Sequence, residues 1–174
     1  MSINDPKILF ETTVTEVRTA TEGDAEQVGT IRHGHDGAIY RWVKNTHTAA
    51  LTIGDVVSHD GATDAANMYK YVENGFTNGL MFMAGVAISA IPINGFGWIQ
   101  VAGINPTILH LGRVATATAV GDSMIADNGT FNCEFGTAVG VAPLYTKSII
   151  ILETVATATT PVAATVAGII QCFV

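Results

Sequence analysis

Apolar and polar side chains alternate most clearly around Trp42. Ile39 and Val43 fall on one side of the segment, while Tyr40 and Trp42 fall on the other, with a period of two residues. A period of two and a high aromatic content predict a strand. The Asp-Gly pair at residues 36–37 is a turn signal, so we expect the strand to begin directly after it.

Other segments predict further strands joined by turns. The run of three isoleucines and a leucine at residues 149–152 has no polar interruption, which predicts a strand buried on both faces. Residues 94–97 form a turn signal before a strand at Trp98, and Asp-Asn-Gly at residues 127–129 predicts a hairpin turn. Residues 68–82 show some helical spacing, but Asn-Gly pairs interrupt it, so we expect little helix.

Composition extends the strand prediction to the whole chain. Among 174 residues there are 22 threonines, 17 isoleucines and 17 valines, whereas leucine occurs only 7 times. β-branched side chains favour a pleated surface over a helix. We therefore expect an all-β protein, a compact β-sandwich or a barrel-like domain. A hydrophobic share of 48% excludes a disordered chain, and a net charge of −7 argues against a nucleic-acid partner.

Charge is unevenly distributed along the chain. Residues 1–73 hold 17 of the 23 charged residues, and residues 74–112 and 154–174 hold none. These charge-free stretches are interrupted by proline, asparagine and threonine, so they do not predict membrane helices, and we expect no membrane partner. The N-terminal residues lack the pattern of a signal peptide, which favours synthesis and use in a cytoplasm.

The charge distribution suggests two parts. Residues 1–36 predict an extended, mostly solvated N-terminal arm, although an edge strand followed by a loop explains the same pattern. Residues 37–174 predict a β domain, and three short matches in the same order suggest an internal duplication of about residues 46–112 and 113–174. The arm's apolar residues, which are candidates for contact with a partner, are Ile8, Leu9, Phe10, Val14 and Val17.

No motif of a known catalytic type occurs, so we expect a protein that is not an enzyme and has no cofactor. His33 and His35 would share a face in a strand, a spacing that suits a metal ion, but we favour the simpler interpretation of two Asp-Gly turns with solvated neighbours. Cys133 and Cys172 predict small buried side chains, and their spacing leaves a disulfide open.

The large apolar residues allow two interpretations. Trp42 and Trp98, together with Tyr69 and Tyr71, could line a sugar-binding face, but such aromatic residues more often lie in a core or a subunit contact. The candidates for core or subunit contacts are Trp42, Trp98, Ile99 and Ile150.

Several of these runs resemble small structural proteins of tailed bacteriophages. The resemblance rests on residues 39–45, 49–57, 85–87 and 95–103, and the nearest group is the head decoration, or cement, proteins. It implies a compact β domain, a homotrimer, and a place on the outer surface of the virion where subunits of the major capsid protein meet. Such a protein stabilises the capsid and has no catalytic residues. The alternatives are another phage component, such as a head fibre base or a tail component, and a carbohydrate-binding β module.

Overall fold

The fold is all-β in every part of the chain that the computed structural model describes, and those parts contain no helix. The described residues are 10–60, 69–74, 83–111, 120–121, 124–126, 133–135, 149–153 and 163–172. The strands are β1 (Val17–Arg18), β2 (Ile31–His33), β3 (Ile39–Asn45), β4 (Val56–His59), β5 (Tyr71–Glu73), β6 (Met83–Ala87), β7 (Phe96–Leu111), β8 (Met124–Ala126), β9 (Cys133–Phe135), β10 (Ile149–Ile151) and β11 (Ala163–Gln171).

Five of these strands close into a barrel. β7 pairs with β6, β6 with β4, β4 with β5, β5 with β3, and β3 returns to β7. The pairing of β3 with β5 is parallel, and the other four pairings are antiparallel. A closed ring leaves none of these five strands with an open edge. The all-β prediction is confirmed, in its barrel-like form.

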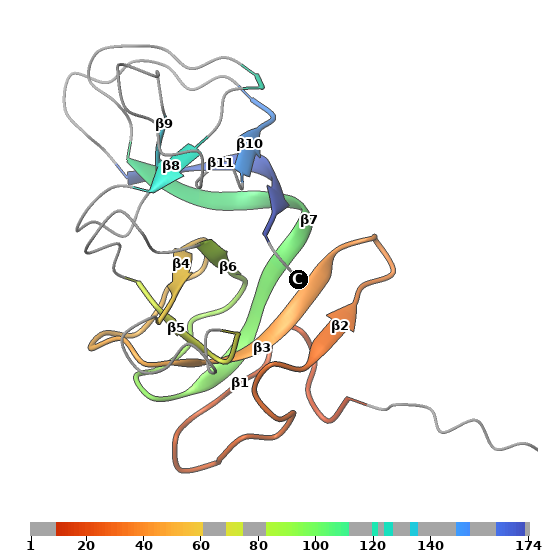
Figure 1. Cartoon of the computed structure of the whole chain (residues 1–174), viewed down its shortest axis with the longest axis vertical. Helices are drawn as coiled ribbons and strands as arrows, with labels where there is room; N and C mark the ends of the chain where they lie inside the picture. The colour runs from red at the N-terminus through yellow and green to blue at the C-terminus, as the bar shows by residue number, and fades with distance from the viewer. Residues whose placement is uncertain are drawn as a thin grey trace, which may run out of the picture.

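Strand β7 belongs to both the barrel and a second sheet. Its first half pairs with β3 and β6, and its second half pairs with β11, which in turn pairs with β10. In Figure 1 the long green ribbon of β7 curves out of the barrel and runs under β8 and β10. Gly103 lies at this junction with a φ of 100°, and a Cβ atom there would lie 3.0 Å from the Cα atom of Ala38. Glycine is therefore needed for the strand to leave the barrel.

Barrel and second sheet share one apolar core. Most strands contribute alternate residues to this cluster, whereas β4 and β6 are buried along their whole length and also contribute adjacent residues. The fully buried members include Val43, Val57, Val72, Val86, Ile99 and Val101 from the barrel, and Ile108, Ile149, Ile151 and Val166 from the second sheet. The two sheets are thus held together by burial of apolar surface as well as by the shared strand.

Burial of β10 differs from the prediction for residues 149–152. Ile149 and Ile151 are fully buried, but Ile150 is 41% exposed and Leu152 is 37% exposed. One face of β10 packs against the apolar core and the other is open to solvent, so that alternate side chains are exposed. The expectation of a strand covered on both faces is therefore wrong for the single chain.

Residues 10–36 do not extend away from the barrel. β1 pairs with the start of β7, and β2 forms an antiparallel hairpin with β3. The expectation of a solvated arm therefore fails for these residues, and the alternative of an edge strand with loops fits them better. Residues 1–9, which include Ile8 and Leu9, lie outside the described residues.

The proposed duplication stays a prediction, because most of residues 113–162 lie outside the described residues. Gly54 and Gly121, which correspond in the two matching runs, both have positive φ, 89° and 96°. β8 and β9 pair as antiparallel neighbours on either side of residues 127–129, as expected for a hairpin. Part of the segment with helical spacing, Tyr71–Glu73, forms strand β5 instead.

Candidate functional site

Two indole rings pack together on the outer face of the barrel. Trp42 and Trp98 are opposite each other on β3 and β7, with ring centroids 5.3 Å apart, and both are fully buried. Phe10 meets the Trp98 ring edge to face, with centroids 5.7 Å apart. The Trp98 Nε1–H donates to Thr12 Oγ1 at 2.9 Å, and the Trp42 Nε1–H donates to Asp24 Oδ1 at 2.8 Å. The N-terminal segment therefore covers the indoles.

This packing decides the role of several predicted residues. Because Trp42 and Trp98 are covered, they form no exposed face for a sugar, and they belong to a core, as does the fully buried Ile99. Phe10 contacts Trp98 and Val17 packs against the barrel core, and both are half-buried, so their contact with a partner stays a prediction. Val14 is partly exposed at a pocket described below.

Three isoleucines form an exposed row across the second sheet. Ile150 of β10 is opposite Ile169 of β11, which is opposite Ile104 of β7. Their exposed fractions are 41%, 37% and 65%, and Leu152 beside them is 37% exposed. Directly opposed residues have Cβ atoms about 5 Å apart, so the row is a continuous apolar strip. We call these four residues the apolar face.

The apolar face has no charged residue on its strands. Residues 96–111 and 163–172, which include β7 and β11, contain no Asp, Glu, Lys or Arg. Contiguous exposed apolar surface on a protein marks a site of contact with another molecule. Sequence reasoning found Ile150 but missed Ile104 and Ile169, because their alignment depends on strand pairing over more than 40 residues.

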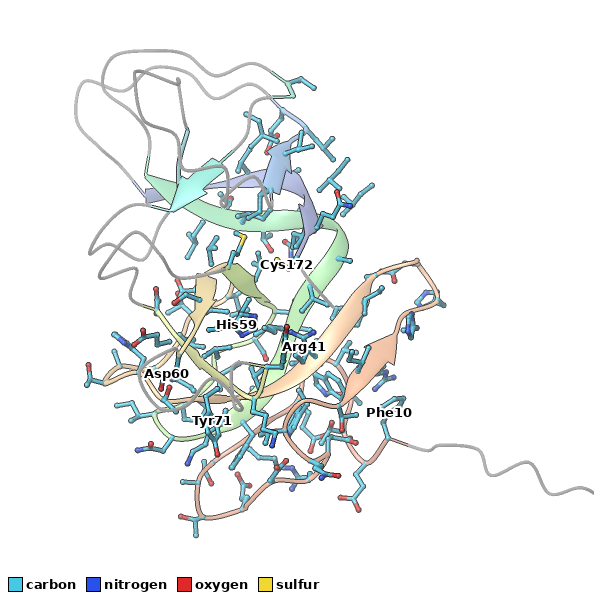
Figure 2. All side chains as sticks on the ribbon, viewed as in Figure 1. Phe10, Arg41, His59, Asp60, Tyr71 and Cys172 are labelled. Carbon is cyan, nitrogen blue, oxygen red and sulfur yellow. The ribbon has the colours of Figure 1, made fainter. Side chains whose placement is uncertain are left out.

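Arg41 and Cys172 lie near each other inside one end of the barrel (Figure 2). Arg41 is 2% exposed, with Cζ 5.0 Å from the centre of the Tyr69 ring, and burial lowers the pKa of its guanidinium. Burial raises the pKa of the Cys172 thiol to about 12, although Arg41 opposes this shift. Cys172 is a free thiol, so the disulfide left open with Cys133 is not formed. A buried neutral thiol is a poor nucleophile, so this pair offers no catalytic group.

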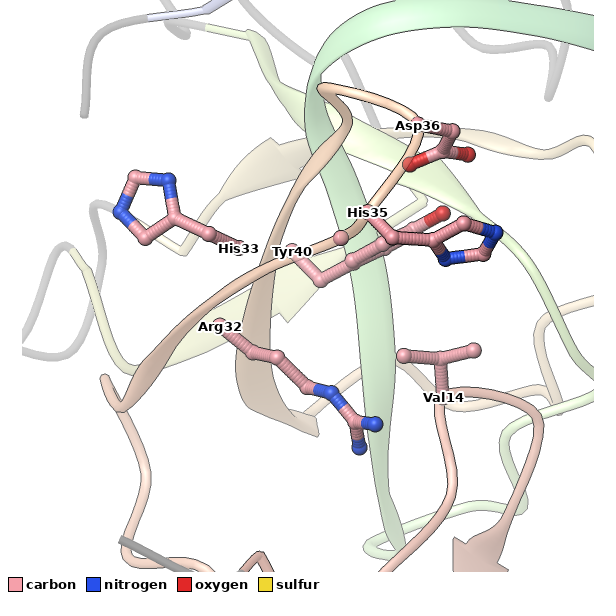
Figure 3. Close-up of a pocket in the computed structure, with 7 residues that line it drawn as sticks. Val14, Arg32, His33, His35, Asp36 and Tyr40 are labelled. Carbon is pink, nitrogen blue, oxygen red and sulfur yellow. The ribbon is translucent and has the colours of Figure 1, made fainter. Parts of the chain in front are cut away.

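A polar pocket lies beside the hairpin of β2 and β3. It has a volume of about 400 Å³ and is lined by Val14, Arg32, His33, Gly34, His35, Asp36 and Tyr40. Figure 3 shows the imidazoles of His33 and His35 pointing to opposite sides. The strand ends at His33, so the two histidines do not share a strand face as the metal hypothesis required. Within the described residues, no three His, Cys, Asp or Glu side chains gather closely enough to hold a metal ion.

A buried aspartate organises the turn before β4. Asp55 is 3% exposed and accepts hydrogen bonds from the Thr52 N–H at 2.6 Å, the Thr52 hydroxyl at 2.9 Å and Asn74 Nδ2 at 3.0 Å. Burial raises the pKa of this carboxyl, against the opposing effect of the hydrogen bonds from Thr52. Its role is structural, since it joins the turn to residues next to β5.

Asp55 should make the folded protein less stable as the pH rises, because the pKa of its carboxyl is raised in the folded state. A raised pKa in the folded state means that the folded protein binds the proton more tightly than the unfolded chain does, so protonation on lowering the pH stabilises the fold. We expect wild-type protein to gain stability relative to Asp55→Asn as the pH falls from 7 to about 4. Urea unfolding of both proteins across this range measures the gap. A gap that is constant or changes in the opposite direction would contradict the raised pKa.

No family model matches the chain, and neither curated proteins nor solved structures give a match. In the part of the chain that the structure describes, no helix is long and apolar enough to cross a membrane. The candidate functional features therefore rest on geometry alone: the apolar face and the polar pocket.

Proposed function

We propose that the protein is a non-enzymatic structural protein of a phage virion, which stabilises the capsid from its outer surface. In this proposal it is a homotrimer bound where subunits of the major capsid protein meet, as the sequence resemblance implies. The observation that supports the proposal most is the apolar face, whose three strands β7, β10 and β11 carry no charged residue. An assembly protein needs such a surface, and the sequence contains no motif of a known catalytic type.

The size of the apolar face is consistent with a contact of this kind. Burying a fully exposed isoleucine contributes roughly 1.5–3 kcal/mol, and each of these partly exposed side chains contributes a fraction of that, so the four together account for a modest local contact. Repetition of that contact over a symmetric capsid multiplies its effect, because each bound copy is held by several contacts at once. The strands that carry the face have no charged residue, and Glu153 beside Leu152 accepts a hydrogen bond from the Ala167 N–H at 2.7 Å, so this one carboxylate lies at the border of the face.

Ile104→Asp tests the proposal. The substitution places a charge at the most exposed residue of a contact that should be apolar, and we expect binding to capsids lacking the protein to weaken at least tenfold. Ile104 is 65% exposed, so the variant should fold normally, which its melting curve checks. Co-sedimentation with expanded capsids measures the binding, and light scattering after gel filtration measures the oligomeric state.

Ile93→Asp provides the matched control. Ile93 is 50% exposed in the turn before β7, away from the second sheet, so this variant should bind as the wild type does. A monomeric Ile104→Asp variant would assign the face to contacts between copies, and a trimer that no longer binds would assign it to the capsid. Unchanged assembly and binding of Ile104→Asp would refute the role of the face. A wild-type monomer without affinity for capsids would refute the function itself.

A further inference from the structure

The polar pocket at the β2–β3 hairpin has features that the proposed assembly role does not use. Its volume of about 400 Å³ falls in the range of sites for small molecules. It lies on the barrel, whereas the apolar face lies on the second sheet, so the two can be tested separately. We propose that this pocket binds one saccharide unit at the end of a glycan chain.

Arg32 forms one wall of the pocket, and its side chain is held by contacts with Thr12 and Phe10. Its Nη1–H donates to the Thr12 carbonyl oxygen at 2.9 Å, and its Cζ lies 4.9 Å from the centre of the Phe10 ring. These contacts fix the guanidinium in place beside Val14 (Figure 3). Arginine has five N–H donors in a rigid fork, and the Thr12 carbonyl takes one of them. A fixed guanidinium is a donor that a ligand hydroxyl group can meet without ordering a flexible side chain.

The hairpin brings a carboxylate and an aromatic ring together at the opposite wall. Asp36 Oδ1 accepts a hydrogen bond from the Ala38 N–H at 3.0 Å, which holds the carboxylate over Gly34. A Cβ atom at Gly34 would lie 2.5 Å from this oxygen and 3.1 Å from Tyr40 Cε2. Glycine at position 34 therefore lets Asp36 and Tyr40 approach each other. Burial and the charge of Asp36 raise the pKa of Tyr40, against the opposing effect of Arg32.

The mixture of groups selects the chemistry of the ligand. A phosphate would bind the Arg32 guanidinium but would be repelled by the Asp36 carboxylate. A wholly apolar ligand would displace water from both charged groups without offering them hydrogen bonds in its place. A sugar ring has hydroxyl groups that both donate and accept, which suits Arg32 and Asp36. It also has an apolar C–H face, which suits the Tyr40 ring and Val14. A saccharide therefore offers a matching group to each of these four side chains.

Binding can be measured by NMR on the full-length protein labelled with ¹⁵N. The probes are the methyl glycosides of glucose, galactose, mannose, rhamnose and N-acetylglucosamine, each added up to tens of millimolar. We expect at least one to shift the backbone amide signals of residues 32–40 in a saturable way. Inorganic phosphate at the same concentrations is the competing probe. Saturable shifts with phosphate alone, or with no probe at all, would overturn the proposal.

Two variants test whether the pocket residues carry the binding. Asp36→Asn keeps an oxygen that can accept from the Ala38 N–H, so the turn should persist, but it removes the negative charge. Arg32→Met keeps an apolar contact with Phe10 but removes the donors. Each should weaken the glycoside affinity at least tenfold, while Arg18→Met, which changes an arginine on β1 outside the pocket, should leave it unchanged. Equal affinity in all three variants would overturn the assignment even if a glycoside binds.

Discussion

Replacing Trp98 by alanine should lower the free energy of unfolding by about 3–5 kcal/mol, the usual range for truncating a large buried aromatic side chain. Trp98 is fully buried between Trp42 and Phe10. Its loss leaves a cavity on the outer face of the barrel and removes the donor that holds Thr12 Oγ1. Chemical denaturation followed by circular dichroism measures the loss.

The variant should also loosen the N-terminal segment. Thr12 is 86 residues away from Trp98 in sequence, so their hydrogen bond is a long-range attachment of residues 10–36 to the barrel. We expect limited proteolysis to cut this segment faster in Trp98→Ala than in the wild type. Trp98→Phe is the control, since it keeps the ring contacts but not the N–H donor, and it should lose less stability. Equal stability of wild type and Trp98→Ala would contradict the burial of this side chain.

Local patterns predicted the strands well because alternation is a property of neighbouring residues. The alternation around Trp42 predicts β3, and the turn signal at residues 94–97 predicts the start of β7. β-branched composition likewise predicts an all-β fold. Closure of the barrel could not be predicted in this way, because it depends on pairing β3 with β7 over about 60 residues. The dual role of β7 depends on Gly103, a residue that sequence alone does not distinguish from other glycines.

The candidate sites show the same limit. An uninterrupted isoleucine run gives no sign of which face is covered, so the sequence predicts a buried Ile150, whereas this side chain is 41% exposed. His33 and His35 form a cluster in the sequence, but β2 ends at His33, so their side chains do not share a strand face. Gly34 and the residues after it form a turn, which separates His33 from His35 and brings Asp36 toward Tyr40. Strand pairing and turn geometry therefore decide which candidate residues lie close enough together to form one site.

Substitution of Gly54 by alanine should destabilise the contact between the barrel and the second sheet. This residue has a φ of 89°, its N–H donates to the Ala87 carbonyl at 2.8 Å, and its own carbonyl accepts from the Leu109 N–H at 2.9 Å. A Cβ atom here would collide with the Thr107 carbonyl oxygen and approach Leu109 Cγ to 3.1 Å. Gly54→Ala should therefore lower the free energy of unfolding by roughly 2–5 kcal/mol, the sum of a left-handed conformation and overpacking.

Gly37→Ala separates the two contributions. Gly37 has a φ of 80°, similar to that of Gly54, but a Cβ atom there would meet nothing within 4 Å. Its substitution should therefore show only the cost of the left-handed conformation, about 1–2 kcal/mol. The difference between the two variants in urea unfolding measures the close approach of Gly54 to β7. If both variants lost the same stability, the turn at Gly54 would not be packed against β7, and the barrel and second sheet would be joined through β7 and the apolar core alone.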